Sequence, residues 1–442
     1  MTDKKPTTAA KTATKTKASG SISKAPAKKA PVKRATVKET PAKKAPASAA
    51  ATANPPTPNA TATESPKAEP TKAKAEVDVT GTDAPETKKQ DEAAQKTSLS
   101  FSGGLQSFLA TQNISIAFTS YQSGNFYLIG GGTDGKLSLH SSKYPKAMGI
   151  VGDGSRIYLA TLSQIVRLEN TLSDGQIANG KHDKVYVPRS FQTTGDVDLH
   201  EVGICKNGRV VFVNTRYSCL AQFNPKHSFE VLWKPPFISK IVPEDRCHLN
   251  GLAMRDGAPK YVTAVCRSDT VDGWRDRRDS GGVIIDIDTN EIMAEGLSMP
   301  HSPRWHNGKL WVLNSGSGEL GWINPDTKSF EPVAFCPGFV RGLAFHGNYA
   351  IMTLSKPRHG RFEGLTLDKT LQDKDADAWC GVQIINLRDG SVAHWVRFDG
   401  AIIELFDVCV LNGVKSAMTL PPGSRELGKF VTFTDATQTR LS

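Results

Sequence analysis

The first part of this 442-residue chain lacks aromatic side chains. Residues 1–97 contain no Phe, Trp or Tyr, and Ala, Lys, Pro and Thr dominate the stretch. A segment with so few large apolar groups cannot bury enough surface to offset the entropy lost on ordering. The composition therefore predicts a disordered basic tail over residues 1–97 and a folded domain over residues 98–442.

The chain also lacks an apolar run of about 18 residues, so no membrane-spanning helix is predicted. No apolar stretch follows the charged N-terminal MTDKKPTTAAKTATK, and a secretory signal is therefore not expected. The number of Cys, 7, is odd, and no C-x-x-C spacing occurs. Free thiols are thus expected rather than a disulfide framework, and together these features predict a cytoplasmic protein.

The basic charge is concentrated in the tail. Residues 1–97 hold 19 Lys and Arg against 10 Asp and Glu, whereas the rest of the chain holds 36 against 34. Runs such as KAPAKKAPVKRA (24–35) resemble the arms of linker histones and bacterial nucleoid-associated proteins. The resemblance implies that residues 1–50 bind nucleic acid without sequence preference, through phosphate contacts. The alternative is a solubilising or tethering linker.

A hairpin-like phrase recurs six times beyond the tail. Each copy has an apolar strand, a turn at or beside Gly, and a strand rich in β-branched and aromatic residues. The copies are YQSGNFYLIGG, VGDGSRIYLAT, CKNGRVVFVNT, MRDGAPKYVTAV, WHNGKLWVLNS and FHGNYAIMTLS. A hairpin that recurs every 40–50 residues or so is typical of a β-propeller, with one four-stranded sheet per repeat.

The repeats predict an all-β propeller with six blades. We assign the first strand of each phrase to the innermost position of its blade. The first two repeats show no clear fourth strand, and the strand-like LFDVCVLNG (405–413) is expected to help close the ring. Seven blades is the alternative, if residues 400–442 form a blade of their own.

The propeller geometry predicts which face carries function. The tight Gly turns between first and second strands lie on one face. The entries to the innermost strands and the loops after the second strands lie on the other. The longest of those loops are residues 267–282 and 356–379. Because long polar loops on a rigid scaffold commonly carry binding residues, we expect the site on this second face.

Three histidines occupy equivalent places on that face. His200, His248 and His301 each begin the innermost strand of a consecutive repeat, so their imidazoles are expected to converge. Three imidazoles with an open position suit zinc, whose bound water becomes a nucleophile at neutral pH. Asp245 and Glu201 beside them are the expected catalytic carboxylates. Alternatively, the histidines cap strand ends or bind an anionic ligand directly.

Seven further residues are expected to bind a small polar or anionic ligand. Two arginines start innermost strands and suit bidentate contact with carboxylate or phosphate, an ion pair with a neighbouring blade being the alternative. A Trp-Arg pair in loop 267–282 resembles a lid over the central funnel. The complete set is Tyr217, Arg246, Asn250, Trp274, Arg275, Arg304 and Arg341. Cys247 beside His248 is expected to pack rather than react, since adjacent strand residues point to opposite faces.

Long literal phrases in the body resemble a bacterial propeller family of conserved hypothetical proteins that carry a domain of unknown function. They include GDVDLHEVG, EDRCHLNGLAM, YVTAVCRSDTVDGWR and GLSMPHSPRWHNGKLWVLNSGSGELG, and the resemblance spans about residues 100–420. It implies a cytoplasmic propeller without an established reaction. At the level of the fold, the chain is also similar to gluconolactonase-type six-bladed propellers, which implies metal-assisted lactone or ester hydrolysis. Those enzymes bind metal chiefly through Glu, Asn and Asp, whereas this chain offers His.

Two classes of function follow from these patterns. One is an enzyme whose funnel holds a divalent metal or an anion over a small polar substrate. The other is a non-enzymatic propeller whose loop face binds a protein, peptide or sugar, while the basic tail tethers it to nucleic acid or a surface.

Overall fold

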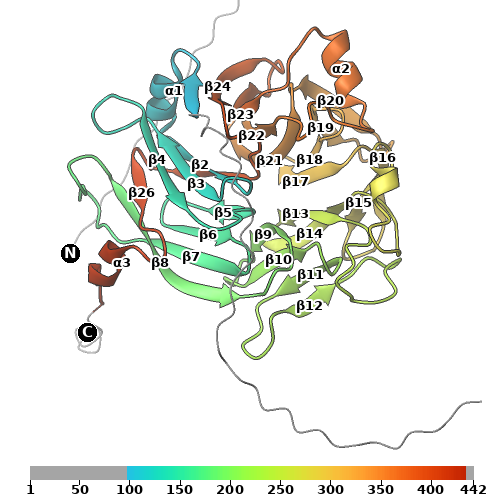
Figure 1. The fold of residues 1–442 in the computed structure, drawn as a ribbon, viewed down its shortest axis with the longest axis horizontal. Coiled ribbons are helices and arrows are strands. Elements are labelled where there is room, and N and C mark those ends of the chain that lie inside the picture. Colours follow the sequence, from blue (N-terminus) through green and yellow to red (C-terminus); the bar gives the residue numbers. More distant parts are fainter. Residues whose placement is uncertain (1–96, 435–442) are drawn as a thin grey trace, which may run out of the picture. The chain divides into compact units, whose positions relative to one another are not determined.

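Six mainly antiparallel sheets surround a common centre in the computed structural model, which describes residues 97–434 (Figure 1). Two predictions, that the tail is disordered and that it binds nucleic acid, concern residues outside this described range. In five sheets the four blade strands follow the sequence order from the centre outwards. Blade 3 contains β9 (Leu199–Ile204), β10 (Val210–Asn214), β11 (Cys219–Gln222) and β12 (Glu230–Trp233). Blade 4 contains β13 (Leu249–Arg255), β14 (Ala258–Ala264), β15 (Gly282–Asp286) and β16 (Ile292–Leu297).

The next two blades repeat the pattern. Blade 5 contains β17 (Pro300–His306), β18 (Lys309–Asn314), β19 (Glu319–Ile323) and β20 (Phe330–Phe335). Blade 6 contains β21 (Phe339–His346), β22 (Tyr349–Ser355), β23 (Cys380–Asn386) and β24 (Val392–Asp399), with β1 (Ser98–Phe101) added at its outer edge. The six-bladed propeller predicted from the repeats is confirmed.

Blade 1 closes the ring with strands from both ends of the described chain. Its order is β25 (Val408–Asn412), β2 (Ile114–Ser120), β3 (Asn125–Gly130) and β4 (Ser138–Lys143). The predicted closing strand is thus the innermost strand of this blade. The assignment of the strand before the first repeated turn (residues 115–121) to the innermost position is wrong, because β2 pairs with β25 on one side and with β3 on the other.

Blade 2 has the fourth strand that the sequence did not reveal. It contains β5 (Ile150–Gly152), β6 (Arg156–Ala160), β7 (Gln164–Asn170) and the ten-residue β8 (Lys184–Thr193). The short β26 (Ala417–Thr419) pairs in parallel with the outer edge of β8. Residues 400–434 therefore complete blades 1 and 2, and they form no seventh blade.

Helices are short within residues 97–434. They are α1 (Leu105–Gln112), the 3-10 turn η1 (Arg275–Arg277), α2 (Leu367–Asp373) and α3 (Arg425–Lys429). No helix in this range is both long and apolar enough to cross a membrane. Helix α2 lies in the long loop between β22 and β23, and this loop places it beside β20 at the outer edge of blade 5 (Figure 1).

The core lies between the blades rather than in one central mass. Buried apolar residues form separate clusters, each mainly between neighbouring sheets, as expected when each blade packs on the next. All seven cysteines are free and buried, which agrees with the thiols expected from the sequence. Burial raises the pKa of Cys247 to about 12, so this residue packs as an apolar side chain, as predicted.

The innermost strands approach closely at glycines. Gly342 on β21 has a φ of 53°, and a Cβ at this position would lie 2.6 Å from the Cα of Asp407, just before β25. Only a residue without a Cβ accommodates both constraints easily. The glycine therefore permits the contact between blade 6 and the closing strand.

Candidate functional site

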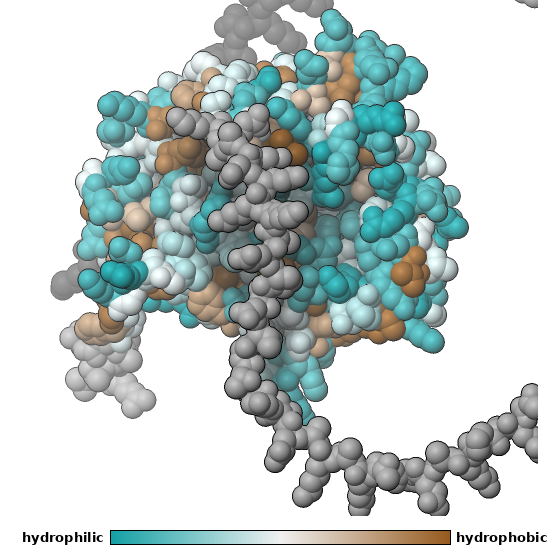
Figure 2. All heavy atoms as spheres, in the orientation of Figure 1, coloured by the Kyte–Doolittle hydropathy of each residue, from teal (hydrophilic) through white to brown (hydrophobic). Residues whose placement is uncertain are grey.

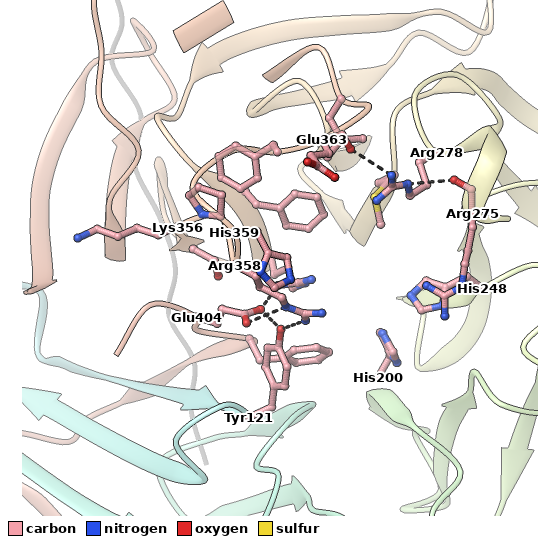
Figure 3. Close-up of a pocket in the computed structure, with 18 of the residues that line it drawn as sticks. Tyr121, His200, His248, Arg275, Arg278, Lys356, Arg358, His359, Glu363 and Glu404 are labelled. Carbon is pink, nitrogen blue, oxygen red and sulfur yellow. Dashed lines mark hydrogen bonds and ion pairs between the residues drawn. The ribbon is translucent and has the colours of Figure 1, made fainter. Parts of the chain in front are cut away.

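A cavity lies on the face predicted to carry function. It has a volume of about 470 Å³, and its lining comes from the entries to innermost strands and from the loops that follow second strands. The loop after β22 alone supplies eight lining residues, from Lys356 to Leu365. This volume falls within the range of small-molecule sites. Figure 3 shows the cavity between two walls, with Tyr121, Arg358 and Glu404 on one and His200, His248 and Arg275 on the other.

The histidine wall is built by blades 3 and 4. The rings of His200 and His248 meet edge to face, with centroids 5.0 Å apart. His248 Nδ1 lies 2.8 Å from Asp245 Oδ2, and His200 Nδ1 lies 2.9 Å from the carbonyl oxygen of Asp198. Burial, followed by the nearby charge of His248, lowers the pKa of His200 to about 4, even though Asp198 opposes the shift. His200 is therefore neutral at physiological pH.

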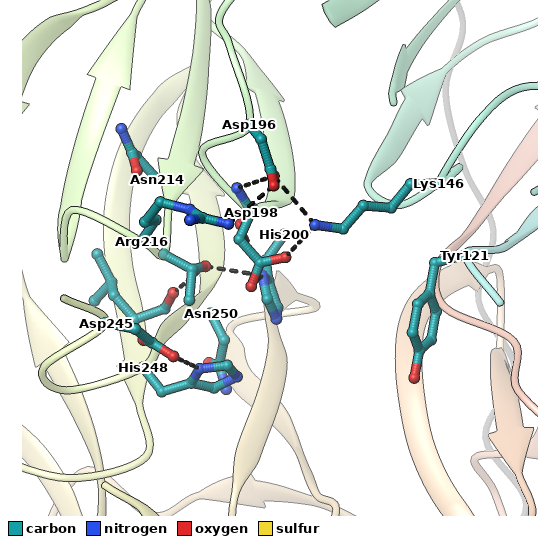
Figure 4. A network of polar contacts seen from close by, with 12 residues as sticks. Tyr121, Lys146, Asp196, Asp198, His200, Asn214, Arg216, Asp245, His248 and Asn250 are labelled. Atoms are coloured by element: carbon teal, nitrogen blue, oxygen red, sulfur yellow. Dashed lines mark hydrogen bonds and ion pairs between the residues drawn. The ribbon is translucent and has the colours of Figure 1, made fainter. Parts of the chain in front are cut away.

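Asp198 connects the histidine wall to a cationic group. Its Oδ1 lies 2.9 Å from Lys146 Nζ, and Lys146 also contacts Asp196 at 3.2 Å (Figure 4). Burial alone would raise the pKa of the Asp198 carboxyl, but His200 and Lys146 outweigh it and hold that pKa well below its usual range. Asp198 is therefore a permanent anion at this rim.

The third histidine does not join the other two. His301 is buried, and its Nδ1 contacts the carbonyl oxygen of Met299 and the hydroxyl of Ser315, at 2.8 and 3.1 Å. Its Nε2 lies 3.3 Å from the amide of Asn250. Both ring nitrogens of His301 thus have partners in the interior. This histidine caps the end of its strand, which was the alternative to metal binding.

The residues present do not fit a metal centre. Within residues 97–434 no group of three or more His, Cys, Asp or Glu side chains is arranged to hold a metal ion. The convergence of three imidazoles predicted from the sequence is therefore limited to His200 and His248, and no step of a mechanism is derived through zinc.

The predicted lid residues line the cavity. Trp274 packs on His248, with ring centroids 4.3 Å apart, and its Nε1 donates to Asp245 Oδ2 at 2.9 Å. The Arg275 guanidinium lies 4.6 Å from the Trp274 ring. Trp274 fixes both members of the His248–Asp245 pair, while Arg275 adds positive charge at the mouth.

The opposite wall was missed by the sequence analysis. The hydroxyl of Tyr121 donates to Glu404 and accepts from Arg358, and Arg358 Nε donates to Glu404 at 2.8 Å. Burial raises the pKa of the Glu404 carboxyl to about 7, even though Arg358 donates to it. The loop that contains Arg358 was expected at this face. Tyr121 was missed because β2, which precedes it, was assigned to the innermost position but is the second strand of blade 1.

Arg341 lies in the cavity as predicted, and its charge is poorly compensated. Its nearest carboxylate contact is Glu404, at 3.9 Å from Nη1 to Oε2, and its buried Nε has no hydrogen-bond partner among the described residues. The guanidinium lies over the ring of Phe339, at 4.5 Å from its centroid. Burial and the neighbouring charge of Arg358 lower the pKa of Arg341 to about 9, which still leaves it cationic at neutral pH.

Glu201 and Arg304 pair with each other instead of facing the cavity. Arg304 also donates to the carbonyl oxygens of Leu343 and Leu252, at 2.7 and 3.3 Å. This outcome is the inter-blade ion pair considered for Arg304, and the expectation that Glu201 acts in catalysis has no geometric support.

Three other expected ligand-binding residues lie away from the lining. Asn250 is buried and accepts from Thr263 at 2.6 Å. Arg246 pairs with Glu244 and Asp269, both at 2.7 Å. Tyr217 packs on Phe229, with ring centroids 5.1 Å apart. The partners named for these three side chains lie outside the cavity lining, and short-range sequence patterns did not reveal them.

The fold and the site define a six-bladed β-propeller with a polar cavity at the loop face. The family model described as a domain of unknown function (DUF4915) matches residues 103–420, and the chain belongs to this family. The match confirms the family resemblance found in the sequence. No curated protein matches the chain.

Solved structures with a similar arrangement share little sequence with this chain. A chain of the nidogen/laminin complex is 12% identical, with a TM-score of 0.43, and the match covers 68% of this chain and 99% of that one. A virginiamycin B lyase from Staphylococcus aureus, crystallised as an inactive variant with quinupristin, is 11% identical with a TM-score of 0.33 and coverages of 69% and 99%. A luciferin-regenerating enzyme is 13% identical with a TM-score of 0.33 and coverages of 70% and 96%. At these identities and scores the similarities carry no argument about function.

Proposed function

We propose that this propeller binds a small organic anion with a carboxylate group in the cavity at its loop face. The observation that carries the proposal is Arg341: a cation held over aromatic rings, with its Nε buried and without a partner among the described residues. A buried guanidinium of this kind gains most from a bidentate oxyanion.

The charge of the lining supports an anionic ligand. Among the described residues that line the cavity, seven are Lys or Arg and four are Asp or Glu. The carboxylates of Asp198 and Glu404 already contact Lys146 and Arg358. The surplus of positive charge in a concave site attracts anions and raises their local concentration.

The size and the charged lining of the cavity favour a small ligand over a protein docked on an apolar face. On the part of the surface visible in Figure 2, hydrophilic residues predominate and the apolar patches are small and separate. We place this binding function in the cytoplasm, which the seven free thiols support. Hydrolysis through a bound metal is left out of the proposal, because His301 is engaged elsewhere.

Calorimetric titration tests the proposal with small hydroxy acids that fit the cavity. The probes are malate, tartrate, gluconate and glucarate, together with their uncharged relatives erythritol and glucose. At least one acid should bind while the neutral polyols do not. Arg341→Met should weaken that binding about tenfold or more, since a hydrogen bond to a charged group is lost.

Arg246→Met is the matched control, because Arg246 pairs with Glu244 and Asp269 outside the cavity. Its affinity for the acids should equal that of the unchanged chain. Equal binding of polyols and acids, no binding of any acid, or full affinity in Arg341→Met would each refute the proposal.

A further inference from the structure

Resting on the proposed anion site, we propose that the cavity is catalytic and dehydrates a small hydroxy acid. His248 removes the proton from the carbon beside the carboxylate, and Tyr121 protonates the hydroxyl that leaves from the next carbon. Arg341 holds the carboxylate. The proposal depends on the arrangement of these three groups around one cavity.

His248 has the contacts of a general base. Asp245 Oδ2 accepts from its Nδ1 at 2.8 Å, and Trp274 packs on the ring while donating to the same carboxylate oxygen. With the proton on Nδ1, the lone pair of Nε2 is available, and Nε2 has no hydrogen-bond partner among the described residues. A carboxylate that orients imidazole in this way is the arrangement that makes histidine an effective base.

The backbone at this pair is also unusual. Asp245 and His248 have φ values of 43° and 50°, a left-handed conformation that costs energy in residues other than Gly. Such conformations persist where the surrounding structure holds them, and they cluster at functional sites. Here they place both side chains on the cavity wall, next to Trp274.

Tyr121 provides the acid on the opposite wall. Figure 4 shows its hydroxyl across an open space from His200 and His248. Arg358 donates to this hydroxyl, and the guanidinium charge would stabilise the phenolate left after proton transfer. A base and an acid on opposite walls match an elimination in which the proton and the leaving group depart from opposite sides of the substrate.

The described lining of the cavity offers no free hydroxyl or thiol nucleophile for covalent catalysis. Of the described lining residues, only Ser355 carries an aliphatic hydroxyl, which donates to the carbonyl oxygen of Leu405 at 3.1 Å. Cys247 is buried with a raised pKa. Direct proton transfer is therefore the chemistry that the side chains support best.

The reaction balances without an oxidant or reductant. His248 Nε2 takes the proton from the carbon beside the carboxylate, and that electron pair forms a double bond to the next carbon. The bond from that next carbon to oxygen breaks, and the leaving hydroxyl takes the Tyr121 proton to depart as water. The imidazolium of His248 then returns a proton to the phenolate through solvent. Arg341 stabilises the negative charge that develops on the carboxylate during the first step.

The experiment follows each acid that binds in the calorimetric panel. The purified protein is incubated with malate, tartrate, gluconate or glucarate in D2O, and NMR records both dehydration and deuterium at the carbon beside the carboxylate. At least one bound acid should be dehydrated. His248→Gln should lose dehydration and exchange by about a hundredfold or more while it still binds the acid. Tyr121→Phe should keep the exchange but lose the dehydration, because only the acid is missing.

Asp245 acts through His248 as a positioning residue. Asp245→Asn should lower kcat with KM unchanged, whereas a general loss of folded protein would lower the melting temperature too. Matched controls come from outside the cavity: His227→Gln on an exposed loop, and Tyr217→Phe beside Phe229. Both should dehydrate the acid at the unchanged rate.

The outcomes separate this inference from the proposed function. An acid that binds through Arg341 but is neither exchanged nor dehydrated would overturn the catalytic inference and leave anion binding in place. Full exchange in His248→Gln, or full dehydration in Tyr121→Phe, would overturn the roles assigned here. Failure of every acid to bind would refute the proposed function itself.

Discussion

Arg304 on β17 forms an ion pair with Glu201 on β9, although blade 4 lies between these two strands. Arg304 Nη2 is also 3.8 Å from Asp407 Oδ1, just before the closing strand β25. One guanidinium thus connects blades 1, 3 and 5 at the centre of the ring. Both members of the pair belong to the inner framework of the propeller rather than to its cavity.

Loss of this arginine should destabilise the fold. Arg304→Met leaves Glu201 and Asp407 as buried carboxyl groups without their cation. The free energy of unfolding should fall by about 3–5 kcal/mol in urea titrations. The double variant Arg304→Met with Glu201→Gln should recover part of this loss. Lys328→Met removes an exposed pair with Glu291 and should change the free energy of unfolding by less than about 1 kcal/mol. Equal losses in Lys328→Met and Arg304→Met would contradict the stabilising role given to Arg304.

Anion affinity should increase as the pH falls through about 7. Below that pH the Glu404 carboxyl is increasingly neutral, so it competes less with the ligand for Arg358 and Arg341. Calorimetry with the tightest-binding acid should show affinity rising by up to about tenfold per pH unit as this single proton is taken up. Glu404→Gln should flatten the dependence, whereas Glu331→Gln on β20 should keep it. An unchanged slope in Glu404→Gln would rule out this carboxyl as the cause.

Acid should destabilise the protein partly through His200. The pKa of His200 is about 4 in the folded state, below the ordinary value of 6.5, so the unfolded chain takes up a proton first as the pH falls. Stability from this group is present above about pH 6.5 and is lost as the pH falls through 4. The shift corresponds to about 3 kcal/mol. In His200→Asn the loss of unfolding free energy between these two pH values should be smaller by roughly this amount. The variant His227→Asn should lose as much stability as the unchanged chain does.

Close packing at Gly342 should be sensitive to one methyl group. Gly342 and Gly347 have similar φ values, 53° and 55°, but only at Gly342 would a Cβ meet the backbone of Asp407. Gly342→Ala should therefore lower the unfolding free energy by about 1–3 kcal/mol more than Gly347→Ala does. Equal losses measured in the two variants would show that backbone conformation alone accounts for the glycine.

Removal of residues 1–97 should show that the tail and the propeller act independently. The excess of Lys over acidic residues in that segment predicts that binding of duplex DNA, and its dependence on salt, disappears with it. The melting temperature of the remaining chain should be almost unchanged. Fluorescence anisotropy with DNA at several salt concentrations measures the first effect and calorimetry the second. DNA binding with an unchanged salt slope after truncation would contradict this prediction.

Local patterns predicted five of the six repeated hairpins in their correct place. The phrases from Val151, Cys205, Met254, Trp305 and Phe345 each join the first and second strands of a blade. The phrase from Tyr121 instead joins the second and third strands of blade 1. Its local pattern is the same, because a hairpin turn is specified by nearby residues whichever strands it connects.

The same limit applies to the site. Equivalent positions in consecutive repeats were enough to predict that His200 and His248 meet, since the strand register repeats from blade to blade. The pattern could not show that His301 is held by Ser315 and Asn250, because that depends on the side chains packed around it.

The sequence by itself determined most of the strands, the tight turns and the face that carries the long loops, and it favoured six blades over seven. These properties follow from alternation, glycine turns and loop length over a few neighbouring residues. Only the tertiary structure decided which side chains share the cavity. Tyr121 meets Arg358 and Glu404, which are 237 and 283 positions away in the chain. Contacts of that range arise only when β25 joins β2 and closes the ring, an event that no local pattern around Tyr121 records.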